Sequence, residues 1–89
     1  MKIAIDYDGT YNADPVVFFT LASVAIGAGH DVKFVTARSS TDDNNDIKKA
    51  ARRLNIKIIF TSGKKKRQYC KGLKWEPDVW VDDNPNAIV

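Results

Sequence analysis

The stretch that decides the fold is IAIDYDGTYN, at Ile3–Asn12. Its apolar first half has the composition of a strand that is buried on both faces. The strand runs into Asp6, and a second aspartate, Asp8, follows before a turn at Gly9 and Thr10. Two aspartates in such a spacing are more often a turn or a helix cap than a site when they stand alone. The rest of the chain therefore has to decide between these interpretations.

A second stretch of the same kind, DVWVDD at Asp78–Asp83, lies close to the other end of the chain. It again places an apolar run before two carboxylates, those of Asp82 and Asp83. Between the two stretches, short apolar runs alternate with helical patterns. We expect strands at 2–6, 31–36, 56–60 and 78–83, and helices at 15–26, 43–54 and 64–73.

The alternation of strands and helices predicts an α/β fold with a parallel sheet and right-handed crossovers. We expect a three-layer, Rossmann-like arrangement with helices on both faces and the short strands in the order 3-2-1-4. This order sets the first and fourth strands side by side, so Asp6 and Asp8 should meet Asp82 and Asp83. Thr36 ends the second strand at the same carboxyl edge, which is where such sheets bind ligands.

The composition is that of one small folded domain spanning residues 1–89, with 44% hydrophobic and 28% charged residues. The single cysteine, Cys70, excludes an internal disulfide, and no basic and apolar leader is visible, so we expect a cytoplasmic protein. The longest apolar run, Val16–Ala28, is too short for a bilayer and is expected to form a deeply packed helix. Because the core is thin, a homo-oligomer would help to close it.

Positive charge is concentrated in one part of the chain. Lys48–Lys74 holds eleven Lys or Arg residues and no Asp or Glu, within a net charge of +3. This block favours an anionic partner or substrate, such as a nucleotide or a nucleic acid. A solvated basic face without any ligand explains the block about equally well.

Four carboxylates at one edge of a sheet repel one another, so they need a compensating cation. No histidine or cysteine lies in these two stretches, and Mg²⁺ prefers oxygen ligands, so the sequence predicts a magnesium site. Magnesium beside an exposed carboxylate suits phosphoryl transfer, since a carboxylate can attack phosphorus to form an aspartyl-phosphate. A second acid two residues away can protonate the leaving oxygen and then activate water.

Four short motifs together resemble those of the haloacid-dehalogenase-like superfamily. They are DYDGT (Asp6–Thr10), VTAR (Val35–Arg38), a lysine of KKK (Lys64–Lys66) and VDDNP (Val81–Pro85). Each motif is close to a strand end, and the four stand in the order that the family shows, over nearly the whole chain. The first motif lies too close to the helix that begins at Pro15 to leave room for a cap domain.

The resemblance implies a small, capless, magnesium-dependent phosphatase. Asp6 would be the nucleophile and a metal ligand, and Asp8 the general acid and base, with its backbone carbonyl also on the metal. Asp83 would be the acidic metal ligand, and Asp82 a further ligand or its support. An open site implies a nucleotide, a nucleic-acid end or another bulky phosphate as substrate.

The resemblance also implies residues that bind the phosphoryl group. Thr36 would donate its hydroxyl proton to that group, and one lysine, Lys66 before Lys65, would hold the nucleophile and the phosphate together. Gly9 and Thr10 would form the turn that presents backbone N–H groups to phosphate. Arg38 would contact the substrate, although the family fixes no such role.

Two other functions stay open on the sequence. One is a catalytically weak module on the same fold that binds nucleic acid or other phosphoanions, which the basic block favours. The other is a receiver-like domain that is phosphorylated on an aspartate and signals. The presence of Asp8 beside Asp6 favours the enzyme over both, because neither function needs an acid and base at that position.

Overall fold

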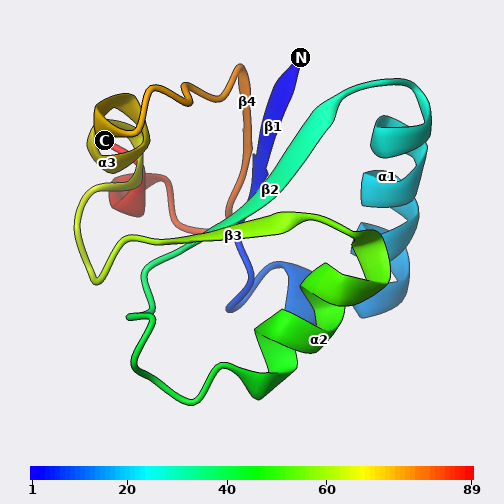
Figure 1. The fold of residues 1–89 in the computed structure, drawn as a ribbon, viewed down its shortest axis with the longest axis horizontal. Helices are drawn as coiled ribbons and strands as arrows, with labels where there is room; N and C mark the ends of the chain where they lie inside the picture. The colour runs from blue at the N-terminus through cyan, green and yellow to red at the C-terminus, as the bar shows by residue number, and fades with distance from the viewer.

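Four parallel strands form one sheet in the order β3-β2-β1-β4, with helices on both faces (Figure 1). The computed structural model describes residues 1–89, and the predicted fold class and strand order are confirmed. The strands are β1 (Lys2–Ile5), β2 (Asp31–Thr36), β3 (Lys57–Phe60) and β4 (Val79–Val81). The helices are α1 (Pro15–Gly27), α2 (Asn45–Leu54) and α3 (Lys66–Gly72), with short 3₁₀ turns η1 (Tyr11–Ala13) and η2 (Pro85–Ala87).

The register of the sheet places the ends of β1 and β4 in one row, and β2 continues for two residues beyond that row. Ile5 at the end of β1 lies opposite Phe34 of β2 and Val81 of β4. The backbone N–H of Asp6 donates to the carbonyl of Val81 at 2.9 Å, which extends the pairing one residue beyond β1. The residues that follow β1 and β4 therefore leave the sheet side by side.

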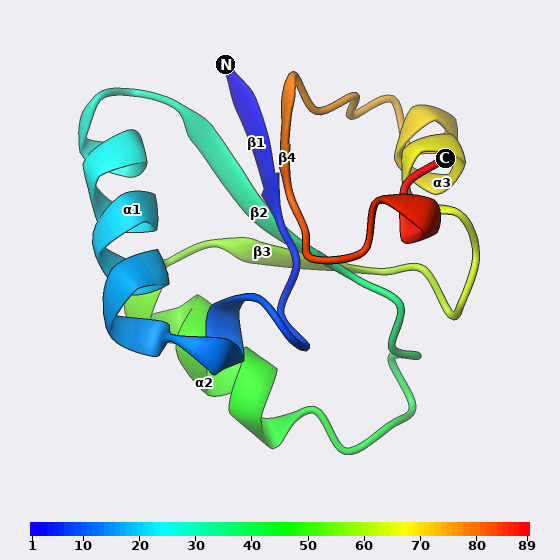
Figure 2. The same ribbon diagram turned by 180° about the vertical axis from the view of Figure 1, so that it is seen from behind.

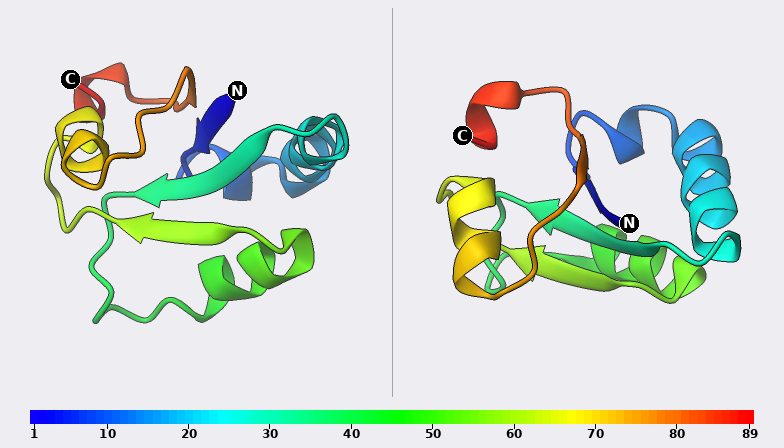
Figure 3. Two further views of the ribbon diagram at one scale, coloured as in Figure 1. Left: turned by 45° about the horizontal axis from the view of Figure 1, so that its top comes forward. Right: turned by 90° about the horizontal axis from the view of Figure 1, so that it is seen from above.

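The helices divide between the two faces of the sheet. Figures 1 and 2 show α1 and α2 together on one side and α3 with η2 on the other. Along β1, Ile3 and Ile5 pack into the cluster beneath α1 and α2, whereas Ala4 between them packs beneath α3 with Cys70 and Trp75. Alternate side chains of β1 therefore point to opposite faces of the sheet and contact different helices, which gives the three predicted layers. Figure 3 shows this layering from two further directions.

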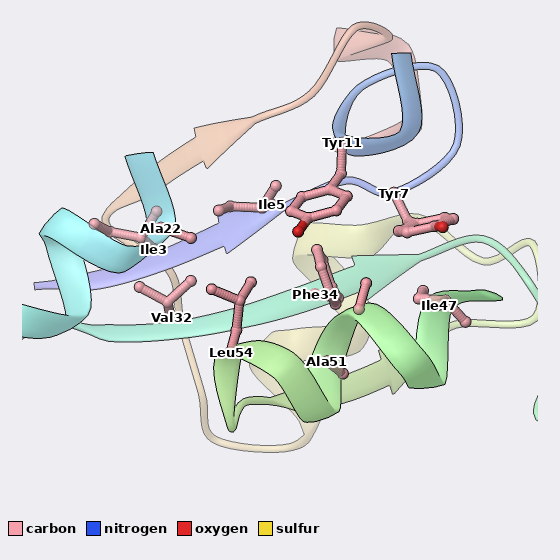
Figure 4. Packing of buried hydrophobic residues seen from close by; sticks show 11 residues of the cluster. Ile3, Ile5, Tyr7, Tyr11, Ala22, Val32, Phe34, Ile47, Ala51 and Leu54 are labelled. Atoms are coloured by element: carbon pink, nitrogen blue, oxygen red, sulfur yellow. The ribbon is translucent and has the colours of Figure 1, made fainter. Parts of the chain in front are cut away.

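The larger core lies between helices α1 and α2 and the first two strands (Figure 4). Ile47 and Leu54 of α2 face the sheet there, with Phe34 of β2 fully buried among them. Because apolar residues recur at helical spacing on one side of α2, its sequence already indicated this face. The edge-on contacts of Tyr7 and Tyr11 with Phe34, at 5.6 and 5.0 Å between ring centroids, extend this core toward the carboxyl edge.

Helix α1 is packed less deeply than the sequence predicts. It begins as predicted, with the Asp14 carboxylate accepting a hydrogen bond from the N–H of Val17 at 3.2 Å. Deep packing is wrong, however, because Ala22 alone is buried, while 77% of Val16 and 67% of Val24 are exposed. The helix touches the sheet along one side, and no further layer covers its outer side. No helix of the structure has both the length and the apolar character that crossing a membrane requires.

Candidate active site

Three aspartates from two strand ends converge at the carboxyl edge of the sheet. Asp6 follows β1, and Asp82 and Asp83 follow β4; one carboxylate oxygen of each lies within 4.8 Å of the others. Asp6 is 7% exposed, whereas Asp83 opens to solvent. The pairing of β1 with β4 is therefore what joins aspartates that are far apart in the sequence.

A buried lysine balances part of this charge. Lys66 is the first residue of α3 and is only 2% exposed. Its Nζ donates to Asp6 Oδ1 at 2.8 Å and to Asp82 Oδ2 at 2.6 Å. Lys65 turns away, and its Nζ donates to the carbonyl of Asn86 at 2.7 Å. Of the two lysines that the sequence suggested, Lys66 is thus the one in the acidic cluster.

Burial and charge perturb the titration of this cluster. Burial raises the pKa of Asp6 to about 6, although the hydrogen bond and charge of Lys66 act in the opposite direction. Burial alone would lower the pKa of Lys66, but its hydrogen bonds to Asp6 and Asp82 outweigh that effect and raise it. Lys66 therefore carries its charge at neutral pH, and Asp6 titrates close to the working range of an enzyme.

The hydroxyl of Thr10 links the two strand ends. Thr10 Oγ1 lies 3.1 Å from Asp6 Oδ2 and 3.1 Å from Asp83 Oδ1, and it accepts a hydrogen bond from the N–H of Asp83 at 3.1 Å. Because a hydroxyl has one proton, it donates to only one of these carboxylates at a time. Thr10 thus fixes the position of Asp83 relative to Asp6.

The turn after Asp8 brings the backbone against Asp83. Gly9 has a φ of +79°, and a Cβ at this position would lie 2.6 Å from Asp83 Oδ2. Its N–H donates to Asn12 Oδ1 at 2.8 Å, and the N–H of Thr10 donates to the carbonyl of Tyr7 at 3.3 Å. Both N–H groups are occupied within the turn, which differs from the expectation that they face a phosphate. The role of Asn12 in this turn was not predicted, although asparagine next to a glycine is a common signal of a turn.

Asp8 and Arg38 form an ion pair beside the acidic cluster. Arg38 Nε and Nη2 donate to the two Asp8 oxygens at 2.9 and 2.7 Å. Arg38 also binds Asp46 in the first turn of α2, through Nη1 at 2.7 Å and Nη2 at 2.9 Å. These bonds raise the pKa of Arg38 and lower that of Asp46 to about 2. Arg38 was expected to contact substrate. Asp46 was not singled out, because no sequence pattern links the loop that carries Arg38 to the first turn of α2.

Thr36 lies beneath the site rather than in it. It is fully buried, and its hydroxyl accepts a hydrogen bond from the N–H of Arg38 at 3.2 Å. The next residue, Ala37, lines the pocket in its place. This placement differs from the expectation that Thr36 donates directly to a phosphoryl group.

A pocket of about 210 Å³ opens over the cluster. It is smaller than the ~300 Å³ at which pockets for whole drug-sized ligands begin, so it suits a terminal phosphate group rather than an entire nucleotide. Neither Ala37 nor Ala87 was recognisable from the sequence, since alanine carries no chemical signal. The pocket is lined by Asp6, Asp8, Ala37, Lys66, Asp82, Asp83, Asn84 and Ala87.

The donor set of the pocket fits a hard divalent cation such as Mg²⁺, because it consists of carboxylate oxygens with no histidine or cysteine. Asp82 accepts from Lys66 through Oδ2 and from the N–H of Asn84 at 2.9 Å through Oδ1. Both of its oxygens are thus engaged. Asp83 Oδ2 accepts no hydrogen bond, and Asp6 Oδ2 is free whenever the single proton of Thr10 is donated to Asp83 instead. Asp6 and Asp83 are therefore the better placed ligands, and Asp82 is better suited to orient Lys66.

The chain was compared with protein-family models, with curated proteins and with solved structures, and none of them matches it. The family resemblance of the four motifs therefore stays a prediction, and the function has to be argued from the pocket itself.

Proposed function

We propose that this protein is a magnesium-dependent phosphomonoesterase of the haloacid-dehalogenase-like type, without a cap domain. The observation that carries the proposal is the buried carboxylate of Asp6, which shares one small pocket with a lysine ammonium and with three further carboxylates. A nucleophile, a fixed positive charge and metal ligands are the parts that phosphoryl transfer through an enzyme carboxylate needs.

The chain's own residues divide the reaction into two displacements. In the first, an oxygen of Asp6 bonds to phosphorus while the bond to the leaving oxygen breaks, and Asp8 supplies the proton that this oxygen takes up. In the second, water attacks the aspartyl-phosphate, Asp8 takes a proton from it, and phosphate leaves with Asp6 restored. Lys66 offsets the negative charge of Asp6 throughout. Bound Mg²⁺ would supply a Lewis acid for the phosphoryl oxygens, held by Asp6 and Asp83.

Turnover of p-nitrophenyl phosphate tests this proposal. We expect the wild-type protein to hydrolyse it with Mg²⁺ and to lose this activity in EDTA, and we expect Asp6→Asn to lower kcat by at least about 10³-fold. Glu76→Gln removes an exposed carboxylate far from the pocket and serves as the matched control. Equal turnover by the wild type and Asp6→Asn, or turnover that EDTA leaves unchanged, would refute the proposal.

A second function, the binding of a phosphoanion or nucleic acid, is favoured by two basic hollows beside α3. They have volumes of about 470 and 360 Å³, and Lys64, Lys65, Arg67 and Lys71 are their cations. Tyr69 lines one of them and offers a ring for base stacking. The cations of α2 do not line these hollows. Lys48 and Arg52, for example, line a separate groove between α2 and β3.

Oligonucleotide binding at several salt concentrations tests the second function. We expect a labelled single strand to bind with a steep salt dependence and the double variant Lys64→Gln/Lys71→Gln to reduce the slope of log K against log salt by about 1.4. The double variant Lys48→Gln/Arg52→Gln removes equal charge elsewhere and should retain that binding. Absent or salt-insensitive binding would remove this candidate and leave the phosphatase.

A further inference from the structure

The guanidinium of Arg38 has no donor left for a substrate. It offers five N–H groups. Nε and Nη2 donate to the two oxygens of Asp8, at 2.9 and 2.7 Å. Nη1 and Nη2 donate to the two oxygens of Asp46, at 2.7 and 2.9 Å. The remaining N–H, on Nη1, is directed to the carbonyl of Asp43 at 3.5 Å.

The arginine is held more firmly than the aspartates that it joins. The side chain of Arg38 is 18% exposed, against 50% for Asp8 and 52% for Asp46. Its Cζ lies 5.2 Å from the centroid of the buried Tyr7 ring, and its backbone N–H donates to the hydroxyl of Thr36. Asp46 belongs to the first turn of α2. Arg38 and Asp46 together thus connect the half-exposed carboxylate of Asp8 to the sheet and to a helix.

We propose that Arg38, itself held by Asp46, is the positioning residue that fixes the carboxylate of Asp8 at the rim of the pocket. This inference rests on the proposed phosphatase activity, because the position of Asp8 matters only if Asp8 acts on a substrate bound over Asp6. It replaces the expectation that Arg38 binds substrate. Binding substrate would require the guanidinium to give up charge-assisted bonds to two carboxylates, which are about twice as strong as neutral hydrogen bonds.

A fixed carboxylate has a kinetic advantage that a free one lacks. An aspartate that is half exposed and unpaired spreads over several side-chain rotamers, and only some of them face the reacting atoms. Two parallel N–H bonds from a planar guanidinium restrict it to one orientation. Loss of such positioning lowers the rate of the chemical steps and leaves the affinity for substrate largely unchanged.

Kinetics of p-nitrophenyl phosphate hydrolysis with Mg²⁺ test the inference. We expect Arg38→Gln to lower kcat about tenfold without raising KM, Asp46→Asn to lower kcat in the same way but less, and Arg38→Lys to recover part of the loss. In an Asp8→Asn background, Arg38→Gln should have no further effect, because its target is gone. Because p-nitrophenolate leaves without a proton, the first displacement still releases it in this background, so the initial burst and the slow turnover that follows can both be compared. Arg52→Gln removes the same charge from the outside of α2 and should match the wild type.

Several outcomes separate this inference from the function on which it rests. A wild-type protein without turnover overturns both. Given an active wild type, a raised KM at constant kcat, or an equal loss from Arg38→Gln with and without Asp8, overturns the positioning role alone and returns Arg38 to the substrate. Hydrogen exchange of the Arg38 Nε–H, followed by nuclear magnetic resonance, gives a readout that needs no turnover. We expect it to be slower than that of Arg52 and to speed up in Asp46→Asn, and equal rates would refute the arrangement.

Discussion

At the scale of single residues, Lys66 balances part of the negative charge of the pocket. Its ammonium is buried between Asp6 and Asp82, so removing it leaves two carboxylates without their partner. We expect Lys66→Met to lower the free energy of unfolding at pH 7 by about 3 kcal/mol or more, measured by urea denaturation, and to abolish turnover. Lys65→Met removes a lysine that binds only the Asn86 carbonyl and should cost little. Similar losses in the two variants would contradict this account of the pocket.

The raised pKa of Asp6 gives a prediction about pH. Asp6 has a pKa of about 6 in the folded protein against 3.8 in an unperturbed carboxyl, so the folded state binds this proton more tightly than the unfolded chain. Without metal, its contribution to stability is therefore largest near pH 4 and is lost as the pH rises through about 6. We expect Asp6→Asn to exceed the metal-free wild type in stability at pH 7.5, by up to about 3 kcal/mol, and to lose this advantage near pH 4. Urea denaturation at both pH values checks this, and a constant difference would contradict it.

The sequence predicted the individual residues of the cluster unevenly. Asp6 and Asp83 were recognisable, because side chains at the ends of neighbouring parallel strands converge when the strand order is right. Lys66, which begins α3, was suggested by the resemblance of the four motifs. The pairing of Arg38 with Asp46 was not, since it depends on the path of an irregular loop and on which charged group reaches which partner. The depth of Thr36 was equally hidden, because a one-residue shift at the end of a strand decides whether Thr36 or Ala37 faces the pocket.

At the scale of elements, the turn between β1 and η1 makes the most specific prediction. Gly9→Ala places a methyl carbon 2.6 Å from Asp83 Oδ2, which is closer than the two atoms can pack, and so forces that carboxylate to move. We expect a loss of Mg²⁺ affinity of about tenfold or more, measured by calorimetric titration, beyond any loss of stability. Gly63→Ala is the matched control, because it has the same φ of +79° with no atom within 4 Å of the added Cβ. Equal effects of both variants on Mg²⁺ affinity would show that backbone strain alone is responsible.

Helices α1 and α2 show what a sequence pattern can and cannot predict about an element. The regular apolar spacing of α2 identified its buried side, including Ile47 and Leu54. The boundaries of α1 were also predictable, from Asp14 and the glycines that end it. Its depth was not, because a helix that is apolar all around carries no directional signal, and the four-stranded sheet covers one side of it only.

At the scale of the whole molecule, the strand order is the feature on which the site depends. The order β3-β2-β1-β4 places β1 beside β4, and with it Asp6 beside Asp83. This order was predictable because right-handed crossovers leave few topologies for four alternating strands. The distribution of the positive charge over the surface was not predictable. It depends on which face of the sheet α2 and α3 each cover, and this decides whether their cations share one surface.

The most direct test of the account is to trap the aspartyl-phosphate. Asp8→Asn should slow the second displacement more than the first when the leaving group is p-nitrophenolate, so the phosphoenzyme should accumulate. Acid quenching followed by peptide mass spectrometry should then find one phosphoryl group on Asp6, in the presence of Mg²⁺ and not in EDTA. A phosphoryl group on another residue, or continued turnover with no phosphoenzyme in either protein, would contradict the proposal that Asp6 is the nucleophile.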